Sequence, residues 1–590
     1  MQDLTSFYTN EIKKYGAELT RIKKLLFASS MIRLTVFCAA GLGVYLIFGD
    51  TKWVLAIILL VIVLFIFLVS RHSDLQYKRD RLKALIQINE TEIKVLGHNF
   101  HDLPEGDAFK DPLHYFSQDI DLFGRGSFYQ YANRTALKQG GETLAGLLKE
   151  NSIENIHEKQ EAIKELAQKP EWRQNFSAIA SLTKTKISTI AIIEWLRGYK
   201  NFVPKILNLL PRFFGAVSIG LFTLYFIDLV AESILVTWWV LGLAITSIYS
   251  KKIMLLGENA SDIQSTFQQY NQLLTEIENM EFTSELLQSK KQEILADKEK
   301  TSEITNRFSK LLYNLEKGNN MLYAIFGNGF FLRTISHCYQ VEQWIQKHGS
   351  SVEKWFETIA FFDAYNTLGN FAFNHPVYSY PVLSEGKIVL RSEGAGHPLL
   401  HPEKSVLNDF QIEKEQFFII TGANMAGKST FLRTVSLQIV MANVGLPVYA
   451  SAVEYSPIKL ITSMRTTDSL TDDESYFFSE LKRLKFIVDE IQTDRYFIVL
   501  DEILKGTNST DKAKGSRKFV ERLVGSKSTG IIATHDLSLC EVAKELPQIE
   551  NHYFDAEIID NELYFDYKFK EGICQNMNAS FLLRKMEIVD

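Results

Sequence analysis

The stretch QFFIITGANMAGKST, residues 416–430, decides the fold of the C-terminal part of this chain. An apolar run at 417–420 leads to Gly422, and four residues later come Gly427, Lys428 and Ser429. Glycines at this spacing let backbone N–H groups turn inward around an anion, and the lysine reaches the terminal phosphates. The helix expected to follow directs its positive end at the same charge. The stretch therefore predicts a phosphate-binding loop whose nucleotide contacts are Gly422, Ala423, Asn424, Met425, Ala426, Gly427, Lys428, Ser429 and Thr430.

A second apolar run, 496–500, ends at two acids, Asp501 and Glu502. Such a run suits a buried parallel strand, and ligands bind at the carboxyl ends of strands in open α/β sheets. We expect Asp501 and Ser429 to hold Mg²⁺ and Glu502 to polarise the attacking water, because phosphoryl transfer depends on positioning and charge neutralisation. Two solvated acids at a strand end are the alternative interpretation, and the phosphate loop in the same chain counts against it.

A third apolar run, 530–533, leads to His535, which we expect to contact the γ-phosphate or to orient the water. A surface histidine is the alternative interpretation. With Lys428 and Glu502, His535 completes the predicted catalytic set of a Mg²⁺-dependent ATP hydrolase. Two polar segments, 463–480 and 505–511, are either plain surface loops or elements that close the nucleotide site across a dimer interface.

The order and wording of these motifs resemble the ATPase domain of the MutS mismatch-repair family, a branch of the ABC-type ATPases. The resemblance rests on TGANMAGKST (421–430), LDEILKGTNSTD (500–511) and IIATHD (531–536). It implies a homodimer in which Ser475, within DDESYFFSEL (472–481), reaches the nucleotide of the other subunit. Ala423 and Ala426 depart from the family's usual proline and glycine, and since both are small the loop should still close.

The resemblance extends upstream of the ATPase motifs. LFGRGSFYQYANRT (122–135) and the stretch 361–381 resemble the beginning and end of the family's helical core, and His397 with the following proline resembles the opening of its ATPase domain. The N-terminus has no room for the family's mismatch-reading domain. The resemblance therefore implies a variant that lacks that domain.

Two pairs of apolar runs interrupt this pattern. The first pair is 31–48 and 53–69, and the second is roughly 213–227 and 233–249, with Asp228 and Glu232 between its members. A membrane span needs about 20 apolar residues, with a lower limit near 17. Both pairs therefore predict transmembrane hairpins, with buried core hairpins of a soluble protein as the alternative.

The charges around these runs favour the membrane. Cations flank both pairs, namely Arg21, Lys23, Lys24, Arg33, Arg71, Lys78, Arg79, Arg81, Arg197, Lys200, Lys205, Arg212, Lys251 and Lys252. By the positive-inside tendency both hairpins enter and leave from the cytoplasm. We expect a multi-pass protein of the inner, cytoplasmic membrane, in contact with lipid and with its soluble domains in the cytoplasm. Four widely spaced cysteines agree with a reducing compartment and no zinc site.

The charge balance argues against strong DNA binding without excluding it. The formal net charge is −6, and residues 251–320 carry nine Lys and Arg against eleven Asp and Glu. Duplex binding relies on cations that neutralise phosphates. We therefore expect DNA to be a possible partner rather than an assured one, together with a protein partner that the sequence does not identify.

These observations predict an α/β ATPase domain with a mostly parallel sheet flanked by helices, preceded by an all-α core or lever and two transmembrane hairpins. The expected domains are 1–100 with the first hairpin, 101–205 as the first part of the core, 206–250 as the second hairpin, 251–395 as coil, lever and the rest of the core, and 396–590 as the ATPase.

Three functions are compatible with this organisation. The first is a membrane-anchored MutS-like ATPase that hydrolyses ATP at a composite dimer site and binds mismatched or branched DNA in a repair-type role. The alternative is an ATP-driven machine that remodels or signals through the membrane without DNA. A scaffold that binds nucleotide without turnover is disfavoured by the intact Lys428, Ser429, Asp501, Glu502 and His535.

Overall fold

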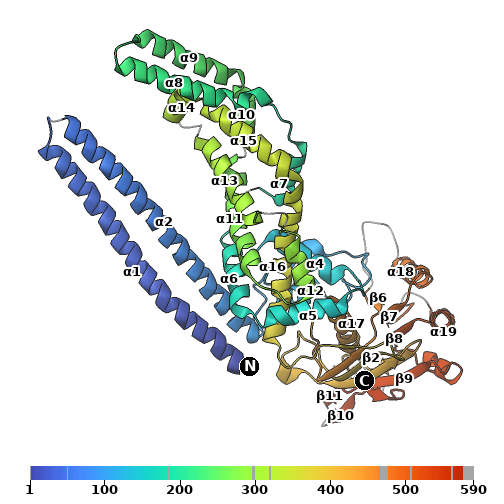
Figure 1. The fold of residues 1–590 in the computed structure, drawn as a ribbon. Helices are drawn as coiled ribbons and strands as arrows, with labels where there is room; N and C mark the ends of the chain where they lie inside the picture. Colours follow the sequence, from blue (N-terminus) through green and yellow to red (C-terminus); the bar gives the residue numbers. More distant parts are fainter. Residues whose placement is uncertain are drawn as a thin grey trace.

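The chain folds into a helical N-terminal part and a C-terminal part built on β-sheets (Figure 1). The computed structural model describes residues 2–49, 51–183, 187–258, 260–295, 299–317, 321–465, 476–504, 508–559 and 562–575. The predicted mixture of an all-helical region followed by an α/β domain is confirmed at this level.

The centre of the C-terminal part is a six-stranded sheet in the order β12-β9-β4-β8-β7-β6. Neighbours from β9 to β6 are all parallel, and only β12 runs antiparallel, against β9. The strands are β4 (Phe417–Gly422), β6 (Lys459–Ser463), β7 (Tyr496–Asp501), β8 (Thr529–Ala533), β9 (Ile549–Phe554) and β12 (Lys570–Glu571). Every residue of β4 and β8 is buried, because helices or sheet cover both faces.

A four-stranded sheet, β1-β5-β2-β3, lies beside the first. Its strands are β1 (Val382–Leu383), β2 (Ile388–Ala395), β3 (Asn408–Glu413) and β5 (Ala452–Tyr455), and a separate ribbon pairs β10 (Glu557–Ile559) with β11 (Glu562–Tyr564). Helix α17 (Lys428–Val444) packs between the two sheets. It contacts β4, β6, β7 and β8, while Gln438 donates a hydrogen bond to Ser392 of β2 at 3.3 Å.

Two further helices complete the α/β domain, α18 (Tyr476–Glu490) and α19 (Ser509–Gly525). The helical part comprises α3 (Phe128–Ala132), α4 (Lys138–Lys149), α5 (Ile156–Ala167), α6 (Pro170–Ser181), α7 (Thr189–Gly198), α11 (Ala260–Asn279), α12 (Glu285–Gln292), α13 (Thr301–Lys317), α15 (Arg333–His348) and α16 (Val352–Asn374). Helix α16 is its axis, since it packs against α4, α5, α6 and α11 and is buried over most of its length.

The segment 258–315 differs from the extended coil that its polar pattern suggests. It folds as α11, α12 and α13, and α11 lies side by side with α13 in an arm that projects away from the sheets (Figure 1). The apolar residues at helical spacing, among them Phe267 and Phe308, pack ring to ring with Trp344 of α15. The arm is therefore a bundle with its own core rather than a solvated coil.

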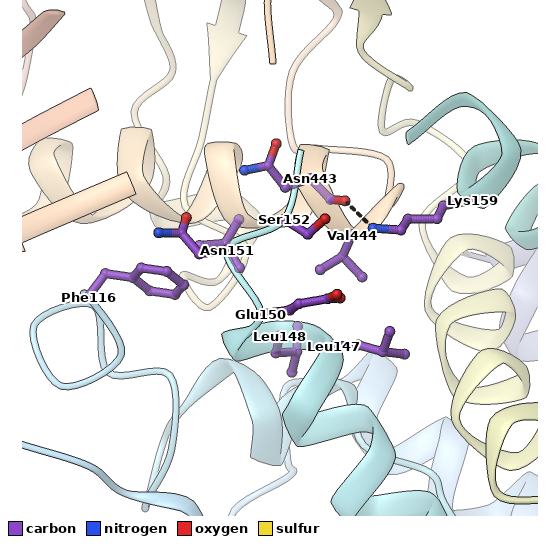
Figure 2. Close-up of a pocket in the computed structure, with 10 residues that line it drawn as sticks. Phe116, Leu147, Leu148, Glu150, Asn151, Ser152, Lys159, Asn443 and Val444 are labelled. Carbon is purple, nitrogen blue, oxygen red and sulfur yellow. Dashed lines mark hydrogen bonds between the residues drawn. The ribbon is translucent and has the colours of Figure 1, made fainter. Parts of the chain in front are cut away.

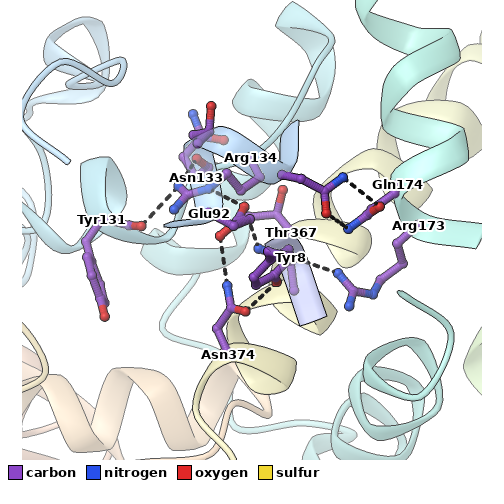
Figure 3. A network of polar contacts seen from close by, with 12 residues as sticks. Tyr8, Glu92, Tyr131, Asn133, Arg134, Arg173, Gln174, Thr367 and Asn374 are labelled. Carbon is purple, nitrogen blue, oxygen red and sulfur yellow. Dashed lines mark hydrogen bonds and ion pairs between the residues drawn. The ribbon is translucent and has the colours of Figure 1, made fainter. Parts of the chain in front are cut away.

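The first apolar pair lies within two long helices, α1 (Gln2–Leu46) and α2 (Thr51–Leu96), which pack against each other along the hairpin. The N-terminus of α1 and the C-terminal end of α2 meet the helical core through buried polar side chains (Figure 3). Tyr8 donates to Asn374 Oδ1 at 2.5 Å, and Glu92 accepts from Arg134 at 2.7 Å and from Asn374 at 2.8 Å. This network ties the base of the hairpin to α16.

The second apolar pair forms α8 (Leu210–Phe226) and α9 (Glu232–Ile248), followed by α10 (Ser250–Gly257) and, later in the chain, α14 (Met321–Phe331). All four lie at the far end of the arm (Figure 1). Among the described residues, three helices are long and apolar enough to cross a membrane: those containing Asp3–Leu46, Ile57–Leu96 and Ile206–Phe226. A fourth is added if α9 and α10, bent by 62°, count as one span.

Candidate functional site

The predicted phosphate loop follows β4 and opens α17, as its sequence indicates. Gly422 and Gly427 have φ values of 143° and 109°, and a Cβ at Gly422 would lie 2.4 Å from the Phe554 carbonyl oxygen. Both positions therefore require glycine. Met425, with a φ of 68°, extends outward with 78% of its surface exposed. Ala426 is fully buried, so it serves the loop through its backbone and small size.

The Lys428 ammonium lies at the centre of the loop and is buried. Its Nζ donates to the carbonyl oxygens of Gly422 at 2.7 Å and Ala423 at 2.9 Å. Burial lowers the pKa of Lys428, and the nearby Asp501 and Glu502 carboxylates oppose that shift. An enclosed ammonium held by backbone carbonyls is placed to exchange these weak acceptors for phosphate oxygens, which are stronger partners.

Ser429 and Asp501 form the candidate magnesium pair. The Ser429 hydroxyl donates to Asp501 Oδ2 at 2.8 Å, which joins the first turn of α17 to the end of β7. A hydroxyl and a carboxylate oxygen are hard donors of the kind that Mg²⁺ prefers, with water and phosphate as its other ligands. The described residues contain no group of three or more His, Cys, Asp or Glu side chains placed to hold a metal. The pair thus fits an ion that arrives with a nucleotide.

Glu502 and His535 stand side by side beyond the ends of β7 and β8. Glu502 Oε1 lies 3.9 Å from His535 Nε2, and the Glu502 backbone N–H donates to the Ala533 carbonyl at 2.9 Å in a left-handed conformation with φ of 53°. His535 Nε2 is also 3.4 Å from Lys428 Nζ. Burial first, and then the Lys428 charge, lowers the pKa of His535. The imidazole is therefore neutral at pH 7.

The structure thus brings together Lys428, Ser429, Asp501, Glu502 and His535 at the carboxyl edge of the parallel sheet. Asn424 and Thr430 are exposed at the mouth of the loop, where a ligand has access to them. Ser475, expected to act across a dimer, lies outside the described residues.

A cavity of about 360 Å³ adjoins the loop and was not anticipated from the sequence. It continues from Gly427 and Thr430, and its other walls include His397, Leu400, Phe554 and Tyr567. Burial lowers the pKa of His397 to about 4, so this wall is uncharged. The His397-Pro398 pair was the sequence signal for this cavity, but it was interpreted only as the start of the ATPase domain. Tyr567, from near the C-terminus, carries no motif.

Two carboxylates from the helical part form hydrogen bonds and ion pairs with the nucleotide-binding part. Asp119 accepts from the Thr462 hydroxyl at 2.6 Å and from the Arg465 N–H at 2.8 Å. Asp121 pairs with Arg465 at 2.6 Å and with Arg433 of α17 at 3.4 Å. One loop thereby contacts both the helix of the phosphate loop and the chain entering the segment 466–475.

A second contact between the two parts surrounds the C-terminal end of α17 (Figure 2). Asn151 exchanges two hydrogen bonds with the backbone of Leu460, at 3.0 and 2.8 Å, and Lys159 donates to the Asn443 carbonyl at 3.5 Å. A Cβ at Gly445 would lie 2.7 Å from Lys159 Cβ. The remaining cavity is only about 10 Å³, so α4, α5 and α17 fit closely.

The comparisons with known proteins agree with this geometry. The family profile described as MutS domain V matches residues 418–584, which include β4, the phosphate loop, the acid pair and His535. Residues 418–584 thus belong to the MutS family.

The chain is also similar to individual proteins over part of its length. It is 30% identical over 236 residues to the DNA mismatch repair protein MutS of Thermotoga petrophila, covering 39% of this chain and 29% of that protein. It is 31% identical over 216 residues to the DNA mismatch repair protein MSH4 of Arabidopsis thaliana, covering 35% and 27%. It is also 31% identical over 196 residues to MutS protein homolog 4 of Homo sapiens, covering 31% and 20%. The chain thus spans less than a third of the length of these curated relatives.

Proposed function

We propose that this chain is a membrane-anchored MutS-family ATPase that binds and hydrolyses Mg²⁺-ATP. One observation carries the enzymatic part. An ammonium, a hydroxyl–carboxylate pair and a carboxylate–imidazole pair meet at the end of one parallel sheet, beside a glycine-bounded loop. Phosphoryl transfer needs these groups in this order, to hold phosphates, to hold the metal and to activate water.

The roles follow from the contacts. Lys428 binds the β- and γ-phosphates, while the Ser429 hydroxyl and the Asp501 carboxylate hold Mg²⁺, which neutralises phosphate charge. Glu502 accepts a proton from the attacking water, and the neutral His535 orients that water or the γ-phosphate. The cavity beside Gly427 takes the nucleotide base, because it is concave, continuous with the loop and lined in part by the apolar side chains of Leu400, Phe431 and Phe554.

The composite site belongs to the same proposal. Ser475 of one subunit reaches the nucleotide of a second copy, so ATP favours the closed dimer and hydrolysis releases it. Asp119 and Asp121 support this arrangement because they fix Arg465 at the start of the segment that carries Ser475. The helical part then receives any movement of that segment directly.

Membrane anchoring is the second component of the proposal. The most apolar windows of α1 and α2 are 0% buried within the protein, which leaves a buried-core hairpin without support. Large side chains such as Phe37, Phe48, Leu60 and Phe67 are more than 60% exposed. A continuous apolar surface of this size requires lipid or a partner. The flanking cations support a location of the ATPase site on the cytoplasmic side of the inner membrane.

Nucleotide binding and turnover are tested on the full-length protein in lipid nanodiscs. We expect wild type to retain and hydrolyse Mg²⁺-ATP, and Lys428→Ala to lose measurable binding. Lys414→Ala, which alters a lysine distant from the loop, serves as the matched control and should bind as wild type does. Equal binding by Lys428→Ala and Lys414→Ala would overturn the site assignment.

The ligand of the helical part has two candidates. The relatives are named as DNA mismatch repair proteins, which supports DNA, mismatched or branched, as the first. The exposed apolar helices and the acidic balance support the second, a machine that acts on the membrane without DNA. We would measure turnover with homoduplex, mismatched and branched DNA across a salt series, and with varied lipid. DNA stimulation that fades with salt favours the first, whereas stimulation by lipid alone favours the second.

A further inference from the structure

Helix α14 is a short apolar element that lies beside the second hairpin although about 70 residues separate them in sequence. Its residues, MLYAIFGNGFF, include no charged side chain. At 11 residues it is too short to span a bilayer. In the structure, α9 packs against α14 more extensively than against its own hairpin partner α8. Helix α14 is therefore the central packing element of the group formed by α8, α9 and α14.

The contact between α9 and α14 depends on glycines. A Cβ placed on Gly242 of α9 would lie 2.2 Å from the Gly329 carbonyl oxygen, and a Cβ on Gly329 would lie 2.0 Å from the Trp239 ring. On the α8 side, Gly215 faces Phe331, and the rings of Phe222 and Phe330 contact each other in a tilted arrangement with centroids 4.8 Å apart. Close backbone approach through small residues is how helices associate within lipid, where apolar burial gives no driving force.

Several polar groups of the three helices are hydrogen-bonded within this part of the protein. Ser218 of α8 donates to the Phe330 carbonyl at 2.6 Å and accepts from Trp238 at 2.9 Å. Trp239 donates to the Ile325 carbonyl at 3.1 Å. Asn328 of α14 accepts from the Thr334 N–H at 2.9 Å, where the chain turns through Leu332 in a left-handed conformation. Internal pairing of this kind suits surroundings without water.

The length and the ends of α14 fix how it would enter a bilayer. Eleven residues of helix extend about 16 Å, roughly half of a hydrocarbon core of about 30 Å. Lys317 precedes the helix and Arg333 follows it in sequence. Because cations favour the cytoplasmic side, Lys317 and Arg333 belong near that surface, and α14 reaches inward from it. Phe326 is 59% exposed on the outer surface of α14, and Ile219 is 61% exposed on α8.

We propose that α14 is a re-entrant membrane helix that contacts lipid acyl chains through Phe326 and locks the second hairpin to the tip of the arm. The proposal rests on the membrane anchoring proposed above. Because α14 leads directly into α15 of the arm and packs against α8 and α9, movement of the arm reaches the bilayer through this helix as well as through α10.

The test places one spin label at a time in the full-length protein in bilayers. Cys38 is replaced by serine first, since the other three cysteines are buried. Labels at Phe326→Cys, Ile219→Cys and, as an aqueous reference, Leu113→Cys, which is 84% exposed, report collision with oxygen against a water-soluble nickel chelate. We expect Phe326 and Ile219 to favour oxygen by at least about fivefold over Leu113.

The possible results distinguish the re-entrant helix from the membrane anchoring. If Ile219 is lipid-exposed while Phe326 matches Leu113, the re-entrant helix is overturned and the anchoring stands. If Ile219 also matches Leu113, the second hairpin lies outside the bilayer and the re-entrant helix is overturned with it, whereas anchoring by α1 and α2 is not affected by that result. A second variant tests the packing: Gly242→Ala should shift the Phe326 label toward water, whereas Gly220→Ala, whose Cβ would have no neighbour within 4 Å, should leave it unchanged. An unchanged signal in Gly242→Ala contradicts the glycine contact.

Discussion

The sheet part and the helical part of this chain bring their polar groups together in different ways. In the sheet part, Asp501 and His535 lie at or just after the ends of β7 and β8, and Lys428 opens the helix that follows β4. The parallel sheet aligns those strand ends. In the helical part, Tyr8, Glu92 and Asn374 meet across hundreds of residues and are nearly inaccessible to water. The first arrangement leaves groups open for a ligand, and the second encloses them to fix helices in place.

The largest expected effect lies in the sheet part. Replacing Glu502 by Gln keeps the shape and the backbone bond to Ala533 but removes the base, so turnover should fall about 10²- to 10⁴-fold while ATP binding persists. Turnover is measured by phosphate release and binding by nucleotide titration. Turnover equal to wild type would show that another group activates the water.

The next effect lies in the helical part. Glu92→Ala leaves Arg134 and two amides without their shared acceptor in a buried site, and should destabilise the protein by about 3–5 kcal/mol. Glu18→Ala, at an exposed acid of α1, is the matched control. Thermal unfolding in detergent measures the difference, and the nucleotide affinity of the folded fraction should not change. If both variants unfold alike, the network in Figure 3 does not anchor the hairpin.

Asp363 of α16 should make the stability of the helical part depend on pH. It is buried, and it accepts hydrogen bonds from the Ala136 and Leu137 N–H groups. Burial raises the pKa of Asp363 to about 7. A raised folded-state pKa gives stability at low pH that is lost as pH rises through 7. That loss is about 1.4 kcal/mol between pH 6 and pH 8.

The Asp363→Asn variant isolates this contribution. We expect the unfolding temperature of wild type to fall more than that of the variant between pH 6 and pH 8, with Asp102→Asn, at an exposed acid, behaving as wild type. Parallel pH dependence in all three proteins would mean that Asp363 is already ionised at pH 6.

The smallest expected effect concerns the contact between the two parts. Asp121 is partly exposed, so its ion pairs with Arg465 and Arg433 are screened by solvent. Asp121→Asn should lower kcat about two- to fivefold with little change in KM, because it loosens the entry to segment 466–475 without touching the phosphate loop. Steady-state kinetics decide, and a change in KM alone would place Asp121 in nucleotide binding instead.

The sheet part was largely predictable because its signals are local. Gly422, Gly427 and Lys428 are spaced for one loop, and continuous apolar runs indicate buried parallel strands whose ends must coincide. The structure places Asp501 beside Ser429 and Glu502 beside His535, as that reasoning requires.

The helical part was less predictable because its decisive contacts are distant in sequence. Nothing near Glu92 in the sequence indicates Asn374 or Arg134 as its partners. The contact between Gly242 and Gly329 joins two helices whose hydropathy does not indicate that they pack together. The polar pattern of 258–315 is typical of an extended coil. The amphipathic stripe in this segment does not reveal that its partner helix follows within the same segment.

The central claim is that one chain holds an ATP-hydrolysing site and is itself anchored in the membrane. The most direct measurement is Mg²⁺-ATP hydrolysis by carbonate-washed membranes that carry the full-length protein, compared with membranes that carry Glu502→Gln. We predict that activity stays with the washed membranes and disappears in the variant. Activity released into the wash, or undiminished in Glu502→Gln membranes, would contradict the account.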